Sequence, residues 1–195
     1  MPRPVVILFA RAPRLGTVKS RLARGIGQRA ALRFYVGTLA AVARPIARDR
    51  RWTTLLATTP RGARARWDRF VPAATRRVAQ PPGDLGRRMA GAMRRHRVAI
   101  LAGSDIPGLR PADIAAAARA LGRADAVFGP AEDGGYWLVG MGPRRPSRPF
   151  AGVRWSGEHA LADTLANFRG RRVALLRCQP DVDTAEDLAA LRAGR

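Results

Sequence analysis

Six short apolar runs alternate along the chain with alanine-rich segments that have helical spacing. The runs have the length and the Val, Ile, Leu and Phe content of buried strands, and they lie at 5–10, 53–58, 98–103, 126–130, 136–141 and 172–177. Helices are predicted between them, chiefly at 28–44, 84–95, 112–121, 157–168 and 184–193. This alternation predicts an α/β fold with a mostly parallel sheet that helices cover on both faces.

The chain length fits one domain, which we expect to span residues 1–195. No linker or internal repeat interrupts the pattern. The apolar run at 5–10 is far shorter than the ~18 residues of a membrane span, and Arg11 follows it, so neither a membrane span nor a signal peptide is predicted. These features are typical of a cytoplasmic protein.

The formal net charge of +22 suggests nucleic-acid binding at first, because clustered basic residues neutralise phosphates. The arginines are spread over the whole chain, however, among alanines rather than aromatic residues that could stack on bases. We therefore interpret most of them as a solvated surface and expect no specific nucleic-acid partner. One basic residue differs from the rest, since Lys19 is the only lysine.

Lys19 lies in the loop after the first apolar run, within "FARAPRLGTVKSRLA". Gly16 permits close backbone approach, Arg14, Lys19 and Arg21 supply cations, and a short helix is expected to begin near 17–18. Such a loop can hold a polyphosphate, with Lys19 as an exposed cation. An ordinary basic turn between a strand and a helix would have the same pattern.

Two aspartates follow other apolar runs. Asp105 stands in "GSDIPGL" and Asp183 in "QPDVDTAEDLAAL", where Thr184 and Asp187 match a helix capping box. The carboxyl ends of parallel strands share one edge of a sheet, so the two carboxylates are expected to converge there. Mg²⁺ prefers one or two carboxylates together with substrate phosphate oxygens, which makes Asp105 and Asp183 candidate metal ligands.

The segment "GPAEDGGYWLVG" at 129–140 reads as a hairpin-like turn that carries functional groups. Asp133 can make the turn and also contact an acceptor molecule, on the opposite side of the cleft from the basic loop. The single cysteine, Cys178, has no histidine near it in sequence, and we expect it to be a buried apolar residue.

Taken together, the stretches "FARAPRLGTVKSRLA", "QPPGDLGRRM", "GSDIPGL", "GPAEDGGYWLVG" and "DVDTAEDL" resemble the glycosyltransferase-A-like nucleotide-diphospho-sugar transferase superfamily in their order and wording. The resemblance is strongest to the rSAM/selenodomain-associated transferase group, which is related to 2-phospho-lactate guanylyltransferase and the molybdenum-cofactor nucleotidyltransferases. It covers nearly the whole chain. Ala185 departs from the related pattern "DTPEDL", and Ile106 stands where a cysteine is frequent.

The resemblance implies a three-layer fold with one antiparallel strand in a mostly parallel sheet. It also implies a site: Arg14, Gly16, Lys19 and Arg21 at the nucleotide phosphates, Gln80, Gly83 and Gly86 at the base and ribose, and Mg²⁺ or Mn²⁺ on Asp105 and Asp183. Lys19, Arg21, Asp105 and Asp133 would be the catalytic residues.

The expected function is metal-dependent transfer from a nucleotide donor to a small-molecule acceptor. Either a nucleotidyl group moves from a nucleoside triphosphate to a phosphorylated or acidic acceptor, or a sugar moves from a nucleotide sugar. A non-catalytic nucleotide-binding or nucleic-acid-associated protein is the alternative, and the oligomeric state is left open.

Overall fold

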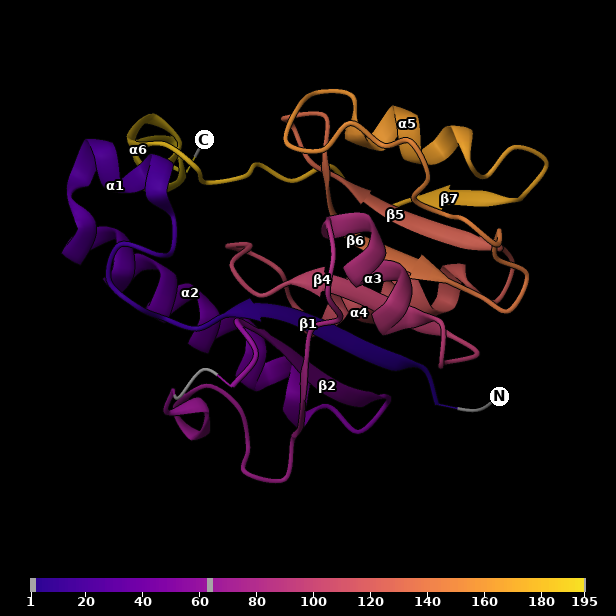
Figure 1. The fold of residues 1–195 in the computed structure, drawn as a ribbon, viewed down its shortest axis with the longest axis horizontal. Coiled ribbons are helices and arrows are strands. Elements are labelled where there is room, and N and C mark those ends of the chain that lie inside the picture. The colour runs from indigo at the N-terminus through magenta and orange to yellow at the C-terminus, as the bar shows by residue number, and fades with distance from the viewer. Residues whose placement is uncertain (1–2, 63–64, 195) are drawn as a thin grey trace.

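The computed structural model describes residues 3–62 and 65–194, whose centre is one seven-stranded sheet (Figure 1). The strand order is β3-β2-β1-β4-β6-β5-β7. All neighbouring strands pair in parallel except β6, which is antiparallel to both β4 and β5. The predicted mostly parallel sheet with one antiparallel strand is therefore confirmed.

The strands coincide with the apolar runs because those runs are long enough to cross the core and carry side chains that are buried on both faces. Their bounds are β1 (Val5–Arg11), β2 (Thr53–Thr59), β3 (Arg76–Ala79), β4 (Ala99–Gly103), β5 (Ala126–Pro130), β6 (Tyr136–Met141) and β7 (Val173–Leu175). The sequence pattern missed β3, whose residues "RRVA" are mostly exposed because it is an edge strand. The pattern also predicted the last strand over 172–177, which is longer than the observed β7.

Helices cover both faces of the sheet. They are α1 (Ser20–Ile26), α2 (Gln28–Arg48), α3 (Leu85–Met93), α4 (Pro111–Ala120), α5 (Ala160–Ala166) and α6 (Ala185–Arg192), with a short 3₁₀ turn at Trp67–Arg69. Among the described residues, no helix is long and apolar enough to cross a membrane.

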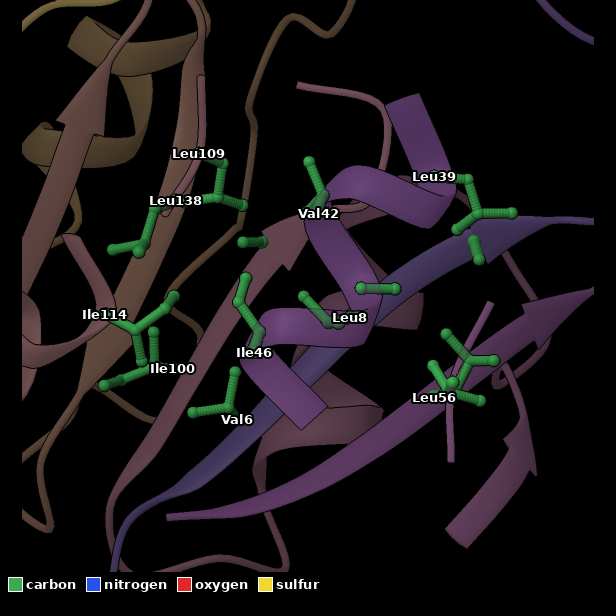
Figure 2. Packing of buried hydrophobic residues seen from close by; sticks show 14 of the residues in the cluster. Val6, Leu8, Leu39, Val42, Ile46, Leu56, Ile100, Leu109, Ile114 and Leu138 are labelled. Carbon is green, nitrogen blue, oxygen red and sulfur yellow. The ribbon is translucent and has the colours of Figure 1, made fainter. Parts of the chain in front are cut away.

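One face packs against α2 and α4, and Figure 2 shows the side chains of α2 directed at the strands. Leu39, Val42 and Ile46 of this helix are fully or almost fully buried. The predicted end of the helix at residue 44 is wrong, because α2 continues through Pro45. Pro45 itself is exposed, and burial of Ile46 one residue later outweighs the usual cost of an interior proline.

The other face packs against α3 and α5, where Met89 and Met93 of α3 lie over Ile7 and Leu101. A third, smaller cluster joins α1, α2 and α6 through Leu22, Ala31, Val182 and Leu188. This cluster matters for the site, because it brings the loop before α1 next to the segment before α6.

Candidate functional site

Lys19 lies at the edge of the sheet where the parallel strands end, surrounded by carboxylates. Its ammonium Nζ lies 3.2 Å from Asp105 Oδ2, 3.2 Å from Asp183 Oδ1 and 3.6 Å from Asp181 Oδ1. The lysine side chain is only 6% exposed, whereas each carboxylate side chain keeps about a third of its surface. The predicted convergence of Asp105 and Asp183 is confirmed. The expectation that Lys19 is an exposed cation is wrong.

The charge balance of this cluster keeps Lys19 protonated. Burial alone would lower the lysine pKa, but the three carboxylates outweigh it and raise the pKa well above the ordinary value. For Asp181 the balance is opposite: burial raises its pKa, and Asp183 adds to the rise, while Lys19 counters it. Lys19 and the more exposed Arg21 thus face three acids, so the carboxylates outnumber their cationic partners.

The backbone at Lys19 is strained. Its φ of 46° and ψ of 51° place it in the left-handed region, and α1 begins only at the next residue rather than near 17–18 as predicted. Of the non-glycine residues that the structure describes, Lys19 and Ser156 alone have positive φ. Such strain persists only where surrounding contacts fix it, and it is concentrated at functional sites.

Helices α1 and α6, which lie side by side in Figure 1, hold the cluster together from outside. Gly25 of α1 faces Ala185 of α6 so closely that a Cβ on Gly25 would lie 2.7 Å from the Ala185 Cβ. At the start of α6, Asp187 accepts hydrogen bonds from the backbone N–H groups of Asp183 and Thr184. The predicted capping box of Thr184 and Asp187 is confirmed, and it fixes the backbone of Asp183.

A polar cleft of about 420 Å³ opens beside the cluster. Arg11, Arg21 and Arg88 line it together with Lys19, and Arg21 donates from its guanidinium to Asp183 across 3.4 Å. The other lining residues include Thr17, Ser20, Tyr35, Thr59, Gln80, Asp105 and Asp183. Guanidinium groups and carboxylates in one cleft suit a polyphosphate with a divalent ion.

Gln80 is fixed within this cleft. Its Nε2 donates to the carbonyl oxygen of Ala57 at 2.9 Å, and its Oε1 accepts from the guanidinium of Arg88. The sequence did not single out Arg88 or Arg11, because nothing distinguishes them from the many surface arginines. Their position at the cleft depends on which strands are neighbours in the sheet.

Tyr35 of α2 was also missed. Its hydroxyl donates to the Arg11 carbonyl at 2.8 Å and accepts from the Arg11 N–H at 2.9 Å, which anchors the end of β1. Burial raises the Tyr35 pKa to about 12, with a further contribution from the Asp105 charge. Asp181 is the fourth residue that sequence reasoning left out of the site, although its place beside Asp183 in "DVD" was a visible signal.

Four of the predicted binding residues lie away from the cleft lining. Arg14 and Gly16 are exposed in the part of the basic loop that precedes Lys19, and Gly83 and Gly86 lie at the start of α3. Gly86 has a packing reason, because a Cβ there would lie 3.0 Å from both Phe150 and Trp155. Contacts of these residues with a bound nucleotide stay predictions.

A second, mainly apolar pocket of about 290 Å³ adjoins the cleft, and Phe9 and Gly103 line both. Asp133 lies at this pocket and not at the cleft, in the turn between β5 and β6, where its Oδ1 accepts from the Gly135 N–H. This turn is the predicted hairpin. Cys178 is exposed, so the expectation that it is buried is wrong.

Asp105 and Asp183 fit a divalent ion in their chemistry. Two carboxylates that approach one cation within 3.2 Å supply the hard oxygen ligands that Mg²⁺ and Mn²⁺ prefer. Among the residues described, no group of three or more His, Cys, Asp or Glu side chains is arranged to hold a metal by itself. The donor set fits an ion that substrate phosphates help to bind, rather than a permanent all-protein site.

A protein family described as "Uncharacterized protein conserved in bacteria (DUF2064)" matches residues 42–157. Comparison with curated proteins finds no match. Among solved structures, a proposed nucleotide-diphospho-sugar transferase from Desulfovibrio desulfuricans G20 is similar with a TM-score of 0.88 and 28% identity, over 98% of this chain and 87% of that chain. The fold implied by the sequence resemblance is thereby confirmed.

Two more distant structures share the fold. Rv0371c of Mycobacterium tuberculosis H37Rv, solved in complex with manganese, has 16% identity and a TM-score of 0.54, over 98% of this chain and all of that one. A CMP:2-keto-3-deoxy-manno-octonic acid synthetase complexed with CTP has 14% identity and a TM-score of 0.51, over 98% of this chain and 97% of that chain.

Proposed function

The chain belongs to the DUF2064 family of bacterial proteins, and on this premise we propose that it is a transferase that moves a group from a nucleotide donor to a small-molecule acceptor. One observation carries the proposal: a cleft with three arginines lies directly beside the Lys19 carboxylate cluster, at the carboxyl edge of the parallel strands. Open α/β sheets bind ligands at this edge.

The donor phosphates would lie at the arginines of the cleft. Arg11 and Arg88 project into it from β1 and α3, and Arg21 extends it toward Asp183. Guanidinium groups bind phosphate oxygens in a bidentate way, and donors fixed before the reaction stabilise the charge that develops on the leaving phosphate. Lys19 would hold Asp105, Asp181 and Asp183 together while the donor binds.

Asp105 and Asp183 would hold Mg²⁺ or Mn²⁺, which when bound neutralises phosphate oxygens as a Lewis acid. The fit of these two carboxylates to such an ion supports this assignment, and the manganese in the Rv0371c structure agrees with it. The excess of carboxylates over Lys19 leaves capacity for a second cation once phosphates share its coordination.

A nucleotide sugar is the leading donor, because the most similar relative described above is named as a nucleotide-diphospho-sugar transferase. A nucleoside triphosphate is the second candidate, because the fold is shared with a synthetase solved with CTP. Both donors place a charged phosphate leaving group in the cleft, so the same residues serve either reaction. The products distinguish them, since only the triphosphate reaction releases pyrophosphate.

The test is titration of the protein with panels of nucleotide sugars and nucleoside triphosphates in the presence of Mn²⁺, followed by calorimetry and thermal unfolding. A donor at a hundredfold excess over its dissociation constant should stabilise the fold by about 2.7 kcal/mol, which raises Tm by roughly 5–10 °C in a chain of this size. Failure of every member of both panels to bind would overturn the proposal.

Matched variants locate the donor. Arg11→Met should weaken donor binding at least tenfold, whereas Arg33→Met, which removes an exposed arginine of α2, should leave it unchanged. Asp105→Asn should abolish the effect of Mn²⁺ on donor affinity while the protein stays folded. Equal losses in Arg11→Met and Arg33→Met would mean that donors bind through net charge alone.

A further inference from the structure

The pocket beside the cleft has a composition that identifies what it can hold. Its volume is about 290 Å³, and its walls are mostly apolar: Phe9, Leu85, Met89, Leu101, Ile106 and Tyr136 are among the lining residues. Phe9 and Gly103 form its border with the cationic cleft. A molecule in this pocket therefore lies next to the donor phosphates.

The charged side chains of the pocket are all acidic. Asp133 and Asp181 line it, and no arginine, lysine or histidine does so in the described part of the chain. Asp181 has a special place, because it lines the pocket and also lies 3.6 Å from Lys19, which lines the cleft. A chain with 36 basic residues and 14 acidic ones thus has a pocket whose only charges are negative.

Aromatic rings form one wall of the pocket. Tyr136 and Trp155 meet edge to face with ring centroids 6.3 Å apart, and the half-buried Trp155 also contacts Phe150. Ser156, which follows Trp155, has a φ of 66°, the second strained non-glycine residue of the described chain. The two strained residues therefore mark the two adjoining cavities, one each.

We infer that the acceptor is an uncharged or cationic molecule with an apolar, ring-sized body, which presents a hydroxyl or amine to Asp133 and Asp181. The inference rests on the proposed transferase function and narrows its acceptor. Aromatic walls favour flat apolar rings, and carboxylates accept hydrogen bonds from a hydroxyl or ammonium group. The phosphorylated or acidic acceptor expected from the sequence would bring a negative charge against two carboxylates without a cation on the pocket wall.

The volume of the pocket is large enough for a ring-sized acceptor body. An apolar cavity of about 150 Å³ can hold one benzene ring, so about 290 Å³ has room for a substituted six-membered ring. The rest of a larger acceptor would extend past Leu85, whose side chain is 40% exposed at the start of α3.

Four probes that share one ring test the inference: benzyl alcohol, benzylamine, benzoate and phenyl phosphate. Binding to the wild-type protein is measured by tryptophan fluorescence, since Trp137 and Trp155 line the pocket, and by saturation-transfer NMR. We expect dissociation constants on the order of 1 mM for the alcohol and the amine, and at least tenfold weaker binding of the two anions. Any probe that pyrophosphate displaces is assigned to the cationic cleft and counted as absent from the pocket.

Charge variants then separate the pocket from the surface. In the double variant Asp133→Asn with Asp181→Asn, the preference for the alcohol and the amine over the anions should fall below about threefold. Asp68→Asn removes an exposed acid of the 3₁₀ turn and should leave the wild-type preference intact. Melting curves confirm that each variant is folded.

Three results would overturn the inference: anions that bind the pocket as tightly as the alcohol, a preference that survives in the double variant, or no pocket binding by any probe. Because the probes are measured without nucleotide, these results are independent of the donor. If the probes bind the pocket as predicted but the protein binds neither nucleotides nor pyrophosphate, the ligand class inferred for the pocket is retained and the transferase function is rejected.

Discussion

Replacing Lys19 by methionine should destabilise the protein by roughly 2–3 kcal/mol, because it removes the buried cation that contacts all three carboxylates of the cluster. Methionine keeps most of the buried aliphatic volume, so the change isolates the charge. The variant leaves Asp105, Asp181 and Asp183 next to one another without the buried ammonium group, while Arg21 still contacts Asp183 at 3.4 Å.

The magnitude follows from the distances. At an effective dielectric constant of about 20, each of the two pairs at 3.2 Å attracts by about 5 kcal/mol. Most of this gain is offset, because burying an ammonium group itself costs several kcal/mol and the carboxylates, about a third exposed, keep part of their hydration. The net loss corresponds to a Tm lower by roughly 5–10 °C.

Asp105→Asn is the matched comparison, and it should change stability by less than about 1 kcal/mol. The carboxylate oxygens of Asp105 and Asp183 lie no farther apart than twice the 3.2 Å that separates each from the same nitrogen. Their repulsion is therefore at least about 2.5 kcal/mol at the same dielectric constant, and Asp181 adds to it. The attraction to Lys19 that Asp105 loses is largely balanced by the repulsion that it also loses.

The assay is urea unfolding at neutral pH, followed by tryptophan fluorescence and circular dichroism, on wild type and both variants. A further readout is the effect of Mn²⁺ without nucleotide, which should raise the Tm of Lys19→Met more than that of the wild type, because the carboxylates there lack their cation. The reasoning is refuted if Lys19→Met is as stable as wild type, or if Asp105→Asn costs more than Lys19→Met.

Three other predictions follow from the structure. Gly25→Ala should destabilise the protein despite its higher helix propensity, and adding Ala185→Gly should restore stability in urea unfolding, because the Cβ atoms would otherwise lie 2.7 Å apart. Asp163→Asn should lower the urea midpoint at neutral pH, and the difference should narrow as pH falls below about 4: hydrogen bonds from Arg154 depress the folded-state pKa of Asp163, so its contribution is present above the unfolded pKa and lost in acid. Binding to duplex DNA should be weak, independent of sequence and lost as salt approaches physiological strength in a fluorescence anisotropy titration; tight selective binding there would restore the nucleic-acid alternative.

The parts of the fold that could be predicted are those that neighbouring residues determine. The apolar runs gave the central strands, and the spacing of Thr184 and Asp187 gave the start of α6, because capping is a contact over three residues. The edge strand β3 was missed because its exposed arginines carry no apolar signal. Pro45 misled the prediction because local propensity gives way to burial of the next turn against the sheet.

The site was predicted in part: Asp105, Asp183, Lys19 and Arg21 were expected there, whereas Asp181, Arg11 and Arg88 were missed. Asp105 comes shortly after β4, as a parallel sheet predicts. Asp183 lies on the segment between β7 and α6, and β6 and β5 separate β7 from β4, so the packing of α1 against α6 is also needed to bring it to Asp105. The burial of Lys19 could not be predicted from its neighbours in sequence, because it depends on carboxylates more than eighty residues away along the chain. Arg11 and Arg88 are indistinguishable by composition from arginines that face water.

Because the charged residues of the cleft are mainly cationic and those of the pocket are acidic, the donor and the acceptor should prefer different cavities. A nucleotide donor gains from Arg11, Arg21 and Arg88 in the cleft and would be repelled by Asp133 in the pocket. A cationic or neutral acceptor has the reverse preference. Asp181 separates the two, since it contacts Lys19 on the cleft side and lines the pocket on the other. If the proposed function holds, electrostatic selection by the two cavities would keep each substrate out of the other's cavity, and the reacting groups would meet at the border that Phe9 and Gly103 form.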